Sequence, residues 1–194
     1  CYSGGWGPSY LEIPRDVLDR EIDIAKAVIP EPGRYRASTR SIGDPDDIEK
    51  LADLLINAER PCILLGTQVW NSRGHKEAIE LVRQLNIPAY FNGSGRGLLP
   101  PGDPHHFHRT RRLAFDRADV IVIVGTPFDF RMGYGRRLGK NAAVVQIDQD
   151  YRTVGKNRDI TLGLVGHPGA ILGAVAQAAS GRADNRAKSR LAWM

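Results

Sequence analysis

The stretch that decides the fold is Val120-Ile121-Val122-Ile123-Val124, which runs directly into Gly125-Thr126. All five residues before the glycine are apolar and β-branched, which favours a strand. A strand with one solvated face would alternate apolar and polar side chains. An unbroken apolar run instead indicates a strand that is buried on both faces, as in a parallel sheet covered by helices.

Four further apolar runs end in the same way, at a small or polar turn residue: 63–65 before Gly66, 89–91 before Asn92, 143–147 before Asp148, and 161–165 before Gly166. Helical patterns lie around and between them, at 44–57, 75–85, 107–117 and 168–179. Alternation of strand and helix predicts an α/β doubly wound fold, with a mostly parallel sheet and helices on both faces. This is a Rossmann-like architecture.

The flanking segments do not continue this alternation. Residues 7–14 read as a single strand closed by a proline, and residues 15–42 contain too many prolines and glycines for a stable element. Asp44-Pro45 then gives a helix start, with a capping carboxylate and proline at the first helical position. Residues 180–194 are polar again. We therefore expect a linker over 18–43, a main domain over 44–180 and a second linker over 181–194.

Composition excludes several classes of protein. Apolar residues make up 42% of the chain, enough for a core, but no apolar run approaches the roughly 20 residues of a membrane span. Two cysteines provide no disulfide framework, and Cys62 falls in a predicted buried strand, which fits a cytoplasmic protein. We expect neither a membrane nor a nucleic-acid partner. The net charge of +5 is concentrated in clusters of arginine, which suit a phosphorylated small molecule as well as a polymer.

The predicted turns suggest a ligand site. In doubly wound sheets, ligands bind outside the carboxyl ends of the strands, where the strand order reverses. Glycines there allow a close approach to phosphate, and a carboxylate after a strand can bind ribose hydroxyls. The candidate cofactor-binding residues are Gly66, Thr67, Gln68, Gly125, Thr126, Phe128, Arg131, Asp148 and Asp150.

Each candidate also has a plain structural interpretation. The glycines can serve only as turns, since no complete dinucleotide or phosphate-loop motif is present. Asp148 and Asp150 can cap the following turn. An aromatic in Phe128-Asp129-Phe130-Arg131 can stack on a flat ring and Arg131 can bind phosphate, or Asp129 and Arg131 can pair with each other.

No catalytic or metal-binding residue is predicted. His105, His106 and His108 lie close together, but zinc needs further ligands at defined spacing, so a solvated helix cap is the favoured interpretation. No serine or cysteine is paired with a base, as covalent catalysis would require. The chain is therefore expected to do no covalent chemistry by itself.

The assembled segments resemble the central domain of thiamine diphosphate-dependent enzymes, in particular the acetolactate synthase group. The segments that carry the resemblance are Arg60–Gly66, Gly95–Pro100, Ala118–Gly125 and Gln146–Asp148, preceded by Gly7–Val17, which is similar to the last strand of that family's pyrimidine-binding domain. The resemblance covers nearly the whole chain. It implies that residues 1–17 end a preceding domain and that 181–194 lead to a C-terminal thiamine diphosphate domain.

The resemblance also implies an activity. Acetolactate synthases decarboxylate a 2-keto acid and join the product to a second carbonyl, using thiamine diphosphate and Mg²⁺ held outside the central domain. Their central domain binds FAD through turns that match Gly66–Gln68, Gly125–Arg131 and Asp148. Related 2-hydroxyacyl-CoA lyases and oxalyl-CoA decarboxylases hold ADP, or contribute to binding CoA, in the same crevice. A homodimer or homotetramer is implied for the full-length protein.

Differences from the family keep three alternatives open. FAD-binding members usually carry glycine where Thr67 and Gln68 stand, and arginine where Pro127 stands. The first alternative is an acetolactate synthase-like enzyme with FAD or ADP, and the second is a lyase acting on an acyl-CoA substrate. The third is a non-catalytic nucleotide-binding or assembly domain.

Overall fold

The computed structural model describes residues 1, 6–31, 33–35, 39–182 and 186–194. The chain divides into two units, residues 1–39 and residues 40–194. The described residues of the first unit form a short helix, α1 (Arg15–Leu18), and a 3₁₀ turn, η1 (Ile24–Lys26). The second unit contains the sheet and its helices.

Five parallel strands form one sheet in the order β2-β1-β3-β4-β5. Their bounds are β1 (Pro61–Leu65), β2 (Ala89–Phe91), β3 (Val120–Val124), β4 (Ala143–Asp148) and β5 (Leu162–Val165). The α/β doubly wound fold with a parallel sheet is confirmed.

Both faces of the sheet are buried, as the unbroken apolar runs predict. Along β3, Val122 and Val124 belong to one core, whereas Ile121 and Ile123 belong to a second core on the opposite face. Every residue of β1 and β3 is buried. Successive side chains of a strand point to opposite faces, so the two cores follow directly from this alternation.

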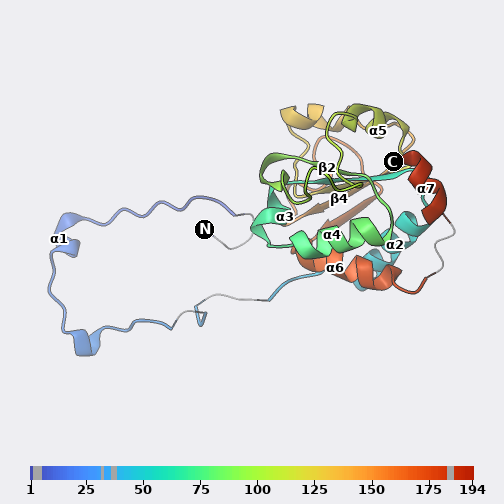
Figure 1. Ribbon diagram of the computed structural model, residues 1–194. Coiled ribbons are helices and arrows are strands. Elements are labelled where there is room, and N and C mark those ends of the chain that lie inside the picture. Colours follow the sequence, from blue (N-terminus) through green and yellow to red (C-terminus); the bar gives the residue numbers. More distant parts are fainter. Residues whose placement is uncertain (2–5, 32, 36–38, 183–185) are drawn as a thin grey trace. The chain divides into compact units, whose positions relative to one another are not determined.

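Helices cover both faces (Figure 1). The larger core is closed by α2 (Pro45–Asn57), α4 (His75–Gln84) and α6 (Pro168–Ala179), which lie together on one side of the sheet. The other side carries α5 (Arg111–Arg117) and the kinked 3₁₀ segment η3 (Phe130–Gly135), which contribute Phe115 and Met132 to the smaller core.

Capping residues set the start of the helices. Asp44 accepts a hydrogen bond from the backbone N–H of Asp46 at 2.9 Å, with Pro45 at the first helical position, so α2 begins where the sequence predicts. At α6 the cap is His167, whose Nδ1 accepts from the N–H of Ala170 at 3.1 Å. Burial, together with the nearby charge of Arg40, lowers the pKa of His167, which keeps the ring in the neutral form that can accept this bond.

Two local expectations are wrong, and one short helix was not predicted. Residues 7–14 form no strand, because a strand without a partner leaves its backbone groups unpaired. The helix expected from residue 107 begins at Arg111. A short helix, α3 (Thr67–Asn71), follows β1 directly, so Thr67 and Gln68 belong to a helix as well as to the turn.

The polar segment after residue 180 contains a helix, α7 (Ala187–Trp193), which packs against the sheet domain. Its Arg190 is fully buried and donates hydrogen bonds to four backbone carbonyls, those of Leu55, Ile56, Ala58 and Leu85. These carbonyls belong to the carboxyl ends of α2 and α4. The carboxyl end of a helix has backbone carbonyls without donors and carries partial negative charge. Arg190 therefore supplies both hydrogen-bond donors and a positive charge at the ends of these two helices. The role of residues 181–194 as a connection to a further domain stays a prediction.

Candidate functional site

The strand order places the candidate site between β1 and β3. In the chain, β1 is followed by β2 on one side, and the chain then crosses over β1 to form β3 on the other side. Strand order therefore reverses between β1 and β3, which is where ligands bind in sheets of this kind. Gly66 directly follows β1, and Gly125-Thr126 directly follows β3.

The turns after β1 and β3 touch each other, and their glycines make this possible. A Cβ on Gly66 would lie 2.0 Å from Thr126 Oγ1 and 2.4 Å from the carbonyl oxygen of Gly125. Gly125 itself has a left-handed backbone, with φ of +60°, and a Cβ there would lie 2.5 Å from Cβ of Gln68. Both glycines are thus required for packing between two turns, whether or not they also approach a ligand.

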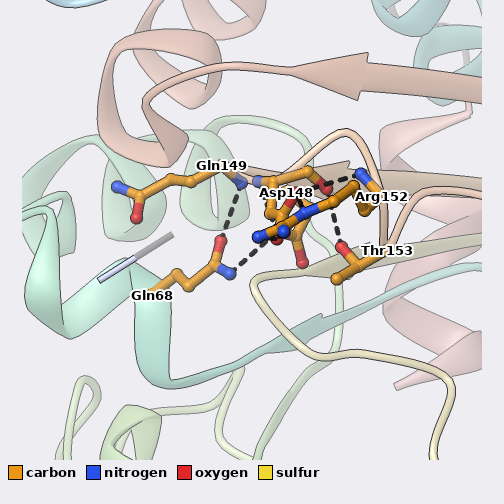
Figure 2. Close-up of polar contacts among 6 residues, drawn as sticks. Gln68, Asp148, Gln149, Arg152 and Thr153 are labelled. Carbon is orange, nitrogen blue, oxygen red and sulfur yellow. Dashed lines mark hydrogen bonds and ion pairs between the residues drawn. The ribbon is translucent and has the colours of Figure 1, made fainter. Parts of the chain in front are cut away.

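Asp148, at the end of β4, is the best-buried acid of the site. Its side chain is fully buried, and its Oδ1 accepts hydrogen bonds from Nε2 of Gln68 and from the backbone N–H of Asp150, each at 2.8 Å. Figure 2 shows the side-chain amide of Gln68 bonded to both Asp148 and the backbone of Gln149; its Oε1 accepts from the N–H of Gln149 at 3.0 Å. Gln68 therefore links the turn after β1 to the turn after β4.

The second oxygen of Asp148 is different. Oδ2 is buried and has no hydrogen-bond partner among the residues that the structure describes. A buried carboxylate oxygen without a donor is costly, by roughly 1–3 kcal/mol or more. It is therefore an unsatisfied acceptor at the carboxyl edge of the sheet, at the end of β4.

Asp150 is only two residues away but is paired within its own turn. Its two oxygens accept from Nε and Nη2 of Arg152 at 2.8–3.1 Å, and its Oδ1 also accepts from the N–H of Arg152 at 3.0 Å. The hydrogen bonds from Arg152 lower the pKa of Asp150. Its carboxylate thus orders the turn, the capping role that we considered for it.

The two candidates in the segment after β3, Phe128 and Arg131, are also engaged in contacts within the protein. Phe128 is a core residue, only 1% exposed, so its ring packs in the smaller core and presents no face to a ligand. Phe130 is the exposed aromatic, at 71%, with the guanidinium carbon of Arg131 5.8 Å from its ring centre. Arg131 itself makes a bidentate ion pair with Asp129 at 2.5–3.2 Å, as the plainer interpretation expected.

The histidine cluster is not a solvated helix cap. His105 is buried, and its ring nitrogens contact Asp103 at 3.1 Å and Asn86 at 3.4 Å. Burial alone would raise the pKa of Asp103, but hydrogen bonds from Arg83 and His105 lower it to about 2. Within the described part of the chain, no group of three or more His, Cys, Asp or Glu side chains could hold a metal ion.

Two residues that support the site, Gln146 and Arg158, were not identified from the sequence. Gln146 is fully buried on β4 and bonds to Thr153 O and Gly155 N, which holds the loop after Asp148. Arg158 donates to the carbonyls of Gly135, Leu138 and Gly139, which holds the end of η3. A polar residue inside an otherwise apolar strand was the available signal for Gln146. Arg158 lies in a loop and gave none.

The sheet edge thus brings together five of the nine candidates: Gly66, Gln68, Gly125, Thr126 and Asp148. Thr67 instead faces the turn η2 (Gly93–Gly95), where its Oγ1 accepts from the N–H of Ser94 at 3.2 Å. The arrangement offers an acceptor at Asp148 Oδ2 beside two glycine turns. A fixed acceptor beside two close-packed turns is suited to binding a ligand.

Comparison with known proteins agrees with this fold. Residues 48–175 match the family model described as the central domain of thiamine pyrophosphate enzymes. The chain belongs to this family. The matched residues run from the first turn of α2 into α6 and include all five strands of the sheet.

The chain is similar to two kinds of relative. It is 35% identical over 175 residues to the acetolactate synthase large subunit of Mycobacterium tuberculosis, covering 87% of this chain and 31% of that protein. It is 26% identical over 189 residues to the 2-hydroxyacyl-CoA lyase 2 of Bos taurus, covering 81% of this chain and 30% of that protein. The chain therefore spans about a third of the length of these relatives.

Solved structures share the fold. Benzoylformate decarboxylase from Polynucleobacter necessarius superposes with a TM-score of 0.64 at 20% identity, covering 83% of this chain and 32% of that one. A putative thiamin diphosphate-dependent enzyme from Mycobacterium smegmatis gives a TM-score of 0.62 at 20% identity, covering 77% and 31%. In the described residues, no helix is long and apolar enough to cross a membrane.

Proposed function

We propose that this chain is the central, nucleotide-binding domain of an acetolactate synthase-like enzyme. The whole protein would decarboxylate a 2-keto acid and join the product to a second carbonyl. Thiamine diphosphate would supply the electron sink for this reaction, bound with Mg²⁺ by parts of the protein outside the described residues. The similarity to the acetolactate synthase of M. tuberculosis over most of the chain supports this assignment.

The role of the central domain itself is to bind FAD or ADP at the carboxyl edge of the sheet. The observation that carries this proposal is the buried Oδ2 of Asp148, which has no partner among the described residues. A ribose hydroxyl donates the hydrogen bond that this oxygen lacks, and acids at the ends of strands bind ribose in nucleotide folds. Gln68 and the N–H of Asp150 fix the carboxylate in place through Oδ1.

A second candidate function is that of a 2-hydroxyacyl-CoA lyase. It is favoured by the similarity to the bovine 2-hydroxyacyl-CoA lyase 2, which extends over 81% of this chain. Assay of the full-length protein with pyruvate and with a 2-hydroxyacyl-CoA, thiamine diphosphate and Mg²⁺ being present, separates the two. Turnover of neither substrate would contradict both assignments. Light scattering of the same preparation tests the proposed homodimer or homotetramer.

The nucleotide site is tested by titrating the full-length protein with ADP and with FAD. Losing one charge-assisted hydrogen bond weakens binding by roughly tenfold or more, so we expect Asp148→Ala to bind at least tenfold less tightly. Asp150→Ala is the matched control, because that carboxylate is already paired with Arg152. Melting curves show whether each variant is folded. Unchanged affinity in a folded Asp148→Ala variant would show that the nucleotide does not bind at this edge of the sheet.

A further inference from the structure

A cavity of about 510 Å³ lies between α5 and η3, on the side of the sheet opposite α2, α4 and α6. In Figure 1, α5 and the gold-coloured η3 segment lie beside each other on that side. Its charged lining residues, which we call the basic pocket, are Arg111, Arg112, Asp116, Arg131, Arg136 and Arg137. Five arginines against one aspartate give the pocket a net formal charge of +4.

Four of these arginines have no acidic partner among the residues that the structure describes. Arg131 is paired with Asp129. Arg111, Arg112, Arg136 and Arg137 make no ion pair with any acidic side chain that the structure describes, although other surface arginines, such as Arg152 and Arg83, do. Like charges held together without counter-charge repel each other and attract anions. An anion bound in the pocket would therefore relieve this repulsion.

The walls of the pocket are fixed before any ligand arrives. Phe115 and Met132, which also line it, are buried in the smaller core, so α5 and η3 are both anchored to the sheet. The guanidinium of Arg158 binds the carbonyls of Gly135 and Leu138 at 2.7 and 3.1 Å, which fixes the end of η3. A site whose walls are already ordered loses less entropy on binding.

One arginine is held by the backbone fold of η3. Gly133 has a left-handed conformation, with φ of +57°, and a Cβ there would lie 3.0 Å from Nε of Arg137. The bare glycine therefore leaves space for the Arg137 side chain to lie against the backbone. This contact places the Arg137 side chain against the backbone of η3, and Arg137 lines the cavity together with Arg111 and Arg112 of α5.

We propose that the basic pocket binds a small molecule that carries two or more phosphate groups. Guanidinium groups bind phosphate oxygens in a bidentate fashion, and two facing walls of arginine suit two phosphates better than one. A volume of about 510 Å³ lies in the usual range for small-molecule sites. Asp148 does not line this cavity, but Arg131, a candidate nucleotide-binding residue, does. Because Arg131 is already paired with Asp129, the inference rests on the four other arginines.

The test is a calorimetric titration of the full-length protein with inorganic pyrophosphate. We expect saturable binding, weakened at least about tenfold in Arg136→Gln/Arg137→Gln and about tenfold in Arg112→Gln, which removes a charge from the opposite wall. Arg117→Gln is the matched control, because Arg117 lies on the same helix but does not line the cavity. It removes the same charge and should change affinity less than about twofold.

Each outcome decides the proposal. Equal weakening in Arg117→Gln and Arg112→Gln would mean diffuse attraction to a basic surface and would overturn it, as would no saturable binding up to about 5 mM pyrophosphate. Retained binding in Asp148→Ala would support it and separate this site from the sheet edge. If Asp148→Ala abolishes pyrophosphate binding while the pocket variants do not, the anion belongs to the nucleotide site instead.

Discussion

Arg190 and the arginines of the basic pocket carry the same charge in opposite surroundings. Arg190 is fully buried and donates hydrogen bonds to carbonyls at the ends of two helices. Arg112, Arg136 and Arg137 are exposed and pair with no acid of the described chain. In the first region the fold itself supplies the negative partial charge that the cation needs. In the second region it does not, and the charge remains available to a ligand.

This difference separates structural arginines from binding arginines. A buried charge persists only when its hydrogen-bond donors are matched, so Arg190 must stabilise the docking of α7. A cluster of exposed, unmatched charges adds nothing to stability and is maintained at the cost of mutual repulsion. The comparison therefore predicts that equivalent substitutions in the two regions have opposite consequences for folding and for binding.

The largest effect is expected at Arg190. Arg190→Met keeps much of the side-chain volume but removes the donors to the carbonyls of Leu55, Ile56, Ala58 and Leu85. Buried acceptors left without partners cost about 1–3 kcal/mol each, although their effects are not additive. We expect a loss of about 3 kcal/mol or more in the free energy of unfolding, measured by urea denaturation.

Lys188→Met, an exposed position on the same helix, is the control and should cost less than about 0.5 kcal/mol. An equally small loss for Arg190→Met would show that α7 is not held to the domain by this residue. The contrast between buried and exposed arginines would then no longer hold.

We expect an intermediate loss of stability at the sheet edge, where the effect comes from steric contact rather than from charge. Gly66→Ala places a Cβ 2.0 Å from Thr126 Oγ1 and 2.4 Å from the Gly125 carbonyl, and the backbone part of this contact cannot rotate away. Forcing the two turns apart should cost about 2 kcal/mol. Gly102→Ala is the matched control, because a Cβ there meets no atom within 4 Å. Thermal melts that coincide for the two variants would mean that the turns after β1 and β3 do not need their close contact.

The sheet could be predicted well from the sequence because strands that are buried on both faces consist almost entirely of apolar residues. Runs such as 120–124 are apolar throughout, and the start of α2 follows from Asp44-Pro45. Residues 7–14 also read as a strand, yet form none. Composition describes the preference of a segment but not whether a neighbouring strand is present to pair with it.

The candidate site was predicted in position but not in detail. Turns after strands identified Gly66, Gly125 and Asp148, because parallel strands bring their carboxyl ends to one edge. The pattern could not show that Phe128 is a core residue, or that Gln68 bonds to Asp148 across 80 residues of sequence. Both depend on which side chains meet in space, as does the burial of Arg190 in a segment that reads as a polar linker.

The smallest effect on stability is expected in the basic pocket. Arg136→Gln/Arg137→Gln removes two exposed charges that repel their neighbours and leaves no acid unpaired, so the free energy of unfolding should stay within about 0.5 kcal/mol of wild type or rise slightly. Urea denaturation at low salt measures this, and added salt should reduce any gain, because screening weakens the repulsion that was removed. A loss comparable to that of Arg190→Met would mean that these arginines hold the fold together. They would then resemble Arg190, and their charge would need no ligand to explain it.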